Sequence, residues 1–71
     1  MRISYDPAVD ALSIVFQETT VTTHDLGDGI AAEYDAAGQL VGLEILDAAQ
    51  RIGGIETLQR VLLERIGPAA A

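Results

Sequence analysis

The sequence predicts a small α+β domain: an antiparallel β-meander of four to five strands, followed by a short helical turn and one C-terminal amphipathic helix packed on the sheet. Three observations predict this fold. Short runs of alternating polar and apolar residues recur through the first two thirds of the chain, turn-forming residues separate them, and an apolar pattern with helical spacing occupies residues 55–66. The longest strand-like run, 40–46, follows a turn at 35–38 and is expected at the centre of the sheet.

The stretches between the predicted strands contain residues suited to turns. Pro7 presets φ for a turn, Asp28-Gly29 readily adopts the positive φ angles of a hairpin loop, and Gly38 can take a left-handed conformation. In the threonine-rich stretch 18–26, polar and apolar residues alternate only weakly, and we expect this strand at an edge of the sheet. The predicted strands are 2–5, 11–17, 18–26, 30–35 and 40–46.

Strand 40–46 is apolar on both faces, and Glu44 is the only interruption. A sheet with one solvated face should have strands that alternate between apolar and polar residues. We therefore expect something to cover part of the second face. Alternation places Leu40, Gly42 and Leu46 on one face, and Val41, Leu43 and Ile45 on the other.

A single helical turn is predicted after this strand, because Asp47 fits an N-cap with Gln50 as its capping-box partner. The amphipathic helix 55–66 follows. Val61 and Leu63 widen its apolar stripe to roughly 200°, whereas about 100° suffices for packing on one sheet. The helix is thus expected to need a second partner surface. We assign residues 1–67 to one domain and 68–71 to a disordered tail.

Composition excludes several classes of protein and site. The 71 residues allow one domain, the absence of cysteine excludes a disulfide framework, and a single histidine, His24, excludes a zinc site of several histidines within one chain. A charge of −7 disfavours direct binding of nucleic acid. No apolar run approaches the roughly 20 residues of a membrane span, and no secretory leader is present, so we expect a cytoplasmic protein without a cofactor.

The surplus apolar surface predicts an interface. Tight packing and oligomerisation are the remaining ways to stabilise so small a core, so we expect a homodimer across a two-fold axis. The alternative is that these side chains are the scattered exposed apolar residues that every protein has. The predicted interface residues are Leu40, Leu46, Val61 and Leu63.

Glu44 and Asp47 are the candidate functional acids. Partial burial of Glu44 on a semi-apolar face would raise its pKa and suit acid/base chemistry. An ion pair with Arg2 or Arg51 is the preferred interpretation, because no nucleophile or second catalytic group has a readable spacing to Glu44. Asp6 and Asp10 flank one turn and are interpreted as turn caps rather than cation ligands. No catalytic residue is assigned.

Two motifs resemble a known family. The patterns Y-D-x-x-x-D-A-L, from Tyr5 to Leu12, and G-x-x-V-G-x-E-I-L-D-A, from Gly38 to Ala48, look like the small bacterial domain of unknown function numbered 2283. The resemblance spans most of residues 1–52. It implies no catalytic residues. Some relatives are encoded beside small toxin-like proteins, so the resemblance implies, by analogy, an antitoxin-like role with a small basic partner.

Two functional hypotheses follow from the sequence. The first is a small acidic protein-interaction module, homodimeric or paired with a small basic protein. The second is a small-ligand-binding or catalytic domain that uses Glu44 and Asp47 in a cleft at a dimer interface. Replacement of Glu44 by glutamine separates them, because this change would abolish acid/base chemistry and leave the affinity of an interaction module nearly intact.

Overall fold

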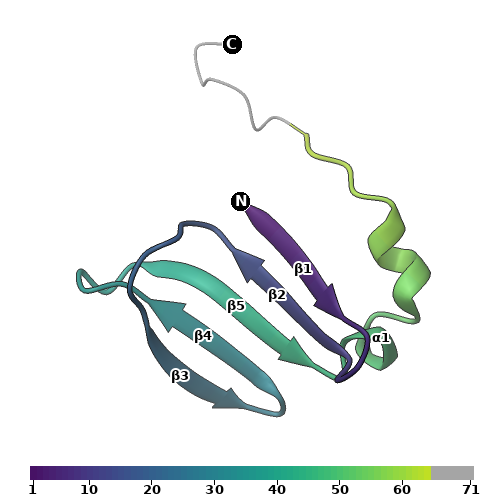
Figure 1. Cartoon of the computed structure of the whole chain (residues 1–71), viewed down its shortest axis with the longest axis horizontal. Coiled ribbons are helices and arrows are strands. Elements are labelled where there is room, and N and C mark those ends of the chain that lie inside the picture. Colours follow the sequence, from purple (N-terminus) through teal and green to yellow (C-terminus); the bar gives the residue numbers. More distant parts are fainter. Residues whose placement is uncertain (65–71) are drawn as a thin grey trace.

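The computed structural model describes residues 1–64, which form one antiparallel sheet and two short helices (Figure 1). All five predicted strands form, with ends that differ from the prediction by a few residues. The class is mostly β with little helix. The elements are β1 (Arg2–Asp6), β2 (Ala11–Val15), β3 (Thr22–Gly27), β4 (Ile30–Tyr34), β5 (Leu40–Leu46), α1 (Ala48–Arg51) and the 3-10 helix η1 (Ile55–Gln59).

The strand order is β1-β2-β5-β4-β3, so the prediction of a simple meander is wrong. β2 pairs with β5 rather than with β3, because residues 16–21 contain no glycine or proline for a tight turn and cross the end of β5 instead. There the backbone N–H groups of Phe16 and Gln17 donate to the Val41 carbonyl at 2.8 and 3.3 Å. The strand predicted to be central, β5, lies in the middle, and the threonine-rich β3 lies at an edge.

A shift in register divides β5 into two parts. Tyr34 pairs with Leu40, so Val41 is an additional residue on β5, as in a β-bulge. Directly paired residues share a face, so Leu40 lies on the face of Tyr34, whereas Leu46 pairs with Ala11 on the opposite face. The prediction that Leu40 and Leu46 share a face is therefore wrong, because simple alternation does not account for an inserted residue.

The register gives the sheet one apolar and one polar face. Within the apolar face only Leu12 and Ala32 are buried, and Val41 and Ala48 complete the buried core of the described residues. The apolar face consists of Ile3, Tyr5, Leu12, Ile14, Ile30, Ala32, Tyr34, Leu40, Leu43 and Ile45, with His24 at its β3 edge. The polar face includes Arg2, Ser4, Ser13, Thr23, Asp25, Ala31, Glu33, Glu44 and Leu46.

The amphipathic helix predicted for 55–66 does not form in the described residues. Only 55–59 are helical, as the 3-10 turn η1, and 60–64 have no helical structure. In Figure 1 this segment runs beside β1, and η1 makes no extensive contact with any strand of the described chain. A helix of about 12 residues is marginal in water without a packing surface. Residues 65 and 66, and the predicted tail 68–71, lie outside the described residues.

Candidate functional site

Three features were candidates for a functional site: a hydrogen-bonded cluster at Asp10, a hollow beside Glu44, and the apolar face. The first joins the β1–β2 turn to α1. The Tyr5 hydroxyl donates to Asp10 Oδ1 at 2.7 Å, and the Ala49 N–H donates to the same oxygen at 2.9 Å. The Asp10 carbonyl also accepts the Ala48 N–H at 3.0 Å. Asp10 therefore fastens one end of the sheet to the start of the helix.

The charges at this cluster are linked. The hydrogen bond from Tyr5 lowers the pKa of the Asp10 carboxyl, and the bond from the Ala49 N–H lowers it further. The same hydrogen bond to Asp10 raises the pKa of the Tyr5 phenol, because the neutral phenol is the donor. At neutral pH the phenol of Tyr5 is neutral and the carboxyl of Asp10 is ionised, so the hydrogen bond between them is maintained without a ligand. The chemistry of this cluster is structural.

Asp47 does not have the predicted capping role. It occupies the N-cap position of α1 in a left-handed conformation, with φ of 52°, and makes no capping hydrogen bond through its side chain. The carboxylate of Asp10 binds the first turn of α1 instead. The sequence pattern predicted that the neighbouring Asp47 caps α1, and it did not identify Asp10, which lies 39 residues before Ala49 in the chain. Asp6 does cap its turn as predicted, by accepting the Ala8 N–H at 2.9 Å.

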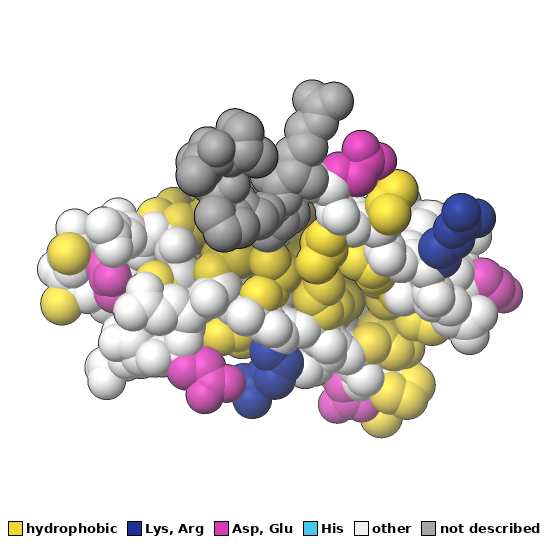
Figure 2. Space-filling model, turned by 90° about the horizontal axis from the view of Figure 1, so that it is seen from above, with side chains coloured by type: hydrophobic (Ala, Val, Ile, Leu, Met, Phe, Trp, Pro, Cys, Tyr) yellow, Lys and Arg dark blue, Asp and Glu magenta, His cyan; other side chains and the backbone are white. Residues whose placement is uncertain are grey.

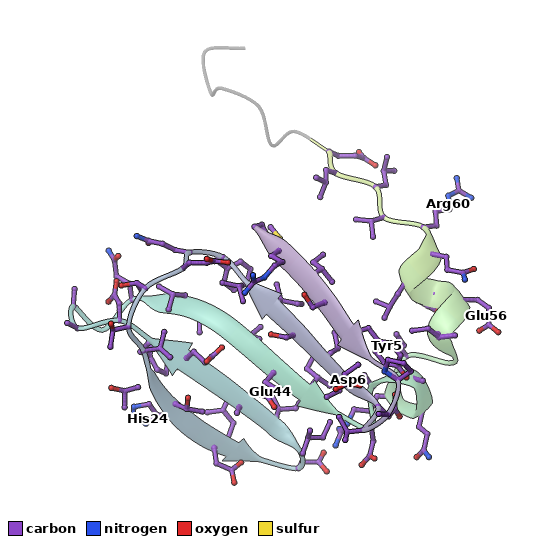
Figure 3. The ribbon with its side chains drawn as sticks, viewed as in Figure 1. Tyr5, Asp6, His24, Glu44, Glu56 and Arg60 are labelled. Atoms are coloured by element: carbon purple, nitrogen blue, oxygen red, sulfur yellow. The ribbon has the colours of Figure 1, made fainter. Side chains whose placement is uncertain are left out.

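Glu44 lines an open hollow of about 470 Å³ on the polar face. Its side chain is exposed, contrary to the predicted partial burial (Figure 3). Neither predicted ion pair forms, because Arg2 pairs with Glu18 at 2.9 Å and Arg51 with Asp28 at 3.5 Å. Asp47 does not line the hollow. The other residues that line it are Thr23, Asp25, Asp28, Gly29, Ile30, Ala31 and Leu46.

The two candidate acids do not form part of a metal-binding cluster within the described residues. Glu44 and Asp47 are not brought into one hollow, and among residues 1–64 no three histidine, cysteine or acidic side chains could hold a metal ion. The ring of His24 lies edge-on to that of Tyr34, with centroids 5.2 Å apart. No helix within this part of the chain is long and apolar enough to cross a membrane.

The apolar face is exposed only in part: Leu12 and Ala32 on it are buried, most of its other residues are half-buried, and Ile3 and Leu40 are exposed. Extensive contacts between elements involve neighbouring strands alone, and neither α1 nor η1 packs extensively on a strand of the described chain. Leu40 on this face is 45% exposed, and Ile3 is similarly accessible. Hydrophobic side chains gather in the middle of the view in Figure 2. Contiguous exposed apolar residues commonly mark interaction surfaces.

A family model described as a protein of unknown function, DUF2283, matches residues 2–49. The chain belongs to the DUF2283 family. The match includes both motifs, and they meet at the start of α1: Asp10 of the first motif, which accepts the Tyr5 hydroxyl, also accepts the N–H of Ala48, the last residue of the second. In this chain the two motifs therefore lie together where the sheet joins α1. No curated protein and no solved structure matches the chain.

Proposed function

We propose that this DUF2283 chain is a homodimeric protein-interaction module that associates through its apolar face. The observation that carries the proposal is the pair of adjacent, largely apolar rows of side chains that cross the sheet, because within residues 1–64 neither α1 nor η1 makes extensive contact with a strand there and Ile3 and Leu40 are exposed. A sheet normally buries its apolar face against a second layer. A second copy supplies that layer in a face-to-face sandwich.

The distribution of charge favours a second copy on the apolar face. That face carries no acidic or basic side chain apart from His24 at its edge, so two copies can meet without burial of a charge. The acids Asp25, Glu33 and Glu44 lie on the polar face, which points away from such a dimer. This arrangement leaves the acidic faces free for a small basic protein, the partner of the antitoxin-like role.

The ligand-binding or catalytic alternative depends on Glu44 and its hollow. If acid/base chemistry occurs there, Glu44→Gln abolishes it while leaving the fold and the dimer unchanged, because the side chain is exposed. In the interaction module, Glu44→Gln weakens a basic partner only slightly through loss of one rim charge. Asp47→Asn serves as the comparison, because Asp47 does not line the hollow.

Leu40 and Leu46 provide a matched test of the proposed dimer. Both are leucines on β5 and both are 45% exposed, but they lie on opposite faces of the sheet. Sedimentation equilibrium should give a dimer for the native chain and for Leu46→Asp, and a monomer for Leu40→Asp at the same concentration. A native chain that stays monomeric at millimolar concentration would refute the proposal. Dissociation by Leu46→Asp alone would move the interface to the polar face.

A further inference from the structure

Strand β3 forms an edge of the sheet, and its backbone is paired on one side only. Within residues 1–64 it pairs with β4 alone, and all its residues are exposed (Figure 1). An edge strand presents a row of N–H and C=O groups that can pair with a strand from another chain. Lysine and proline commonly protect such edges, and β3 contains neither. Its bulge lies at the end, between Asp25 and Gly27, so residues 22–25 keep a regular register.

The hollow on the polar face opens beside this edge. Cross-strand pairing places Asp25, Ala31 and Glu44 in one row on β3, β4 and β5, and all three line the hollow of about 470 Å³. The short Ala31 side chain lies between the two acids, whose strands are roughly 10 Å apart. Leu46 adds an apolar wall. An apolar floor with acidic sides suits the methylene stem and charged head of lysine or arginine.

The charges around β3 favour a basic partner over a second copy. Arg51 pairs with Asp28 at 3.5 Å, whereas no ion pair among residues 1–64 involves Asp25 or Glu44. Two β3 edges paired with each other would bring two acidic hollows together, and like charges on paired strands repel. The opposite edge, β1, begins with Arg2, which would repel a basic segment.

We infer that an extended, basic segment of a partner protein adds to β3 as a sixth strand. The inference rests on the small basic partner of the proposed function and specifies where that partner binds. Backbone hydrogen bonds to the edge hold the segment, and its alternate side chains decide the specificity. A residue directly opposite Asp25 shares its face, so a lysine or arginine there lies beside the Asp25 carboxylate at the mouth of the hollow. The apolar face takes no part in this contact.

Two synthetic peptides test the strand addition. One alternates lysine and threonine over eight residues, and the other has the same residues in two blocks, so charge and composition match. In about 0.15 M salt, where charges more than roughly 8 Å apart are screened, NMR titration of the 15N-labelled chain should show tighter binding of the alternating peptide. Alternate amides of β3 should then exchange more slowly with solvent, because their N–H groups donate to the added strand.

The other outcomes of the titration separate the inference from the proposed function. Equal affinity for the two peptides, or slower exchange in β1 instead of β3, would overturn strand addition at β3 and leave the proposed dimer standing. Protection of β3 amides that rises with protein concentration before peptide is added would assign the edge to a second copy, which also overturns the inference. If neither peptide binds, the basic partner of the proposed function is overturned as well.

Asp25→Asn, with Asp35→Asn as its control, separates the contact at Asp25 from the charge of the whole chain. Asp25 accepts the Gly27 N–H at 2.8 Å and Asp35 accepts the Ala37 N–H at 2.9 Å, and the amide oxygen of asparagine can keep either bond. Asp25→Asn should raise the dissociation constant of the alternating peptide about threefold. Asp35→Asn removes the same charge away from the hollow and should leave the constant nearly unchanged. Equal effects of the two variants would overturn the site.

Discussion

Replacement of Leu12 by alanine tests whether the register places the core correctly. Leu12 is 4% exposed and lies between Tyr5 on β1 and Ile45 on β5. Truncation of a buried leucine removes its transfer free energy and leaves a cavity, so Leu12→Ala should reduce the free energy of unfolding by about 3 kcal/mol. For a chain of this length the total is roughly 4 to 10 kcal/mol, so the loss is a large part of it.

The same truncation at Leu46 is the control for this prediction. Leu46 is nearly half exposed, and its removal leaves an open surface rather than a cavity, so Leu46→Ala should cost about 1 kcal/mol. Urea unfolding followed by far-ultraviolet circular dichroism measures both values. The experiment is repeated at several protein concentrations, because association stabilises the folded chain. Equal costs for the two variants would refute the assignment of the two faces.

Three further changes test particular contacts. Tyr5→Phe should raise the depressed pKa of the Asp10 carboxyl towards its ordinary value. The ionised carboxylate stabilises the fold at a pH above its ordinary pKa, and this contribution is lost as the pH falls through the depressed pKa of the folded state. Between about pH 5 and 2 the midpoint of urea unfolding should therefore fall less steeply with pH in the variant than in the native chain. Gly42→Ala should cost about 1 to 2 kcal/mol in urea unfolding, because the new Cβ would lie 3.2 Å from the Ile14 carbonyl, a backbone atom; a neutral result would contradict the tight approach. Arg51→Ala should lower the stability by about 1 kcal/mol and speed amide exchange in the β3–β4 turn, which its guanidinium contacts; unchanged exchange would show that the contact contributes nothing.

The strands could be predicted from sequence because each is a local pattern. Alternation of apolar and polar residues identifies β2 and β4, and Asp35 with Gly38 identifies the turn before β5: the Asp35 carboxylate accepts the Ala37 N–H, and Gly38 adopts φ of 81°. The position of β5 at the centre followed from its apolar residues on both faces. These features are properties of neighbouring residues, and neighbouring residues are what a sequence pattern reports.

The errors concern relations between distant residues. The pairing of β2 with β5 and the capping of α1 by Asp10 both join parts of the chain separated by about 30 residues or more, and no local pattern encodes them. The bulge at Val41 places Leu40 on the face opposite to the predicted one. A bulge is defined by the pairing with the partner strand, here β4, so the sequence of β5 alone does not reveal it. The helix predicted for 55–66 had the required periodicity, but periodicity alone does not supply a surface on which to pack.

The hydrogen bond from the Ala49 N–H to Asp10 divides the chain into a scaffold and an appendage. Every strand precedes Ala49, and the DUF2283 match also ends there. A different sequence could therefore follow residue 49 without loss of a strand or of either bond to the Asp10 carboxylate. A graft of an unrelated C-terminal segment after Ala49 should therefore yield the same five-stranded sheet.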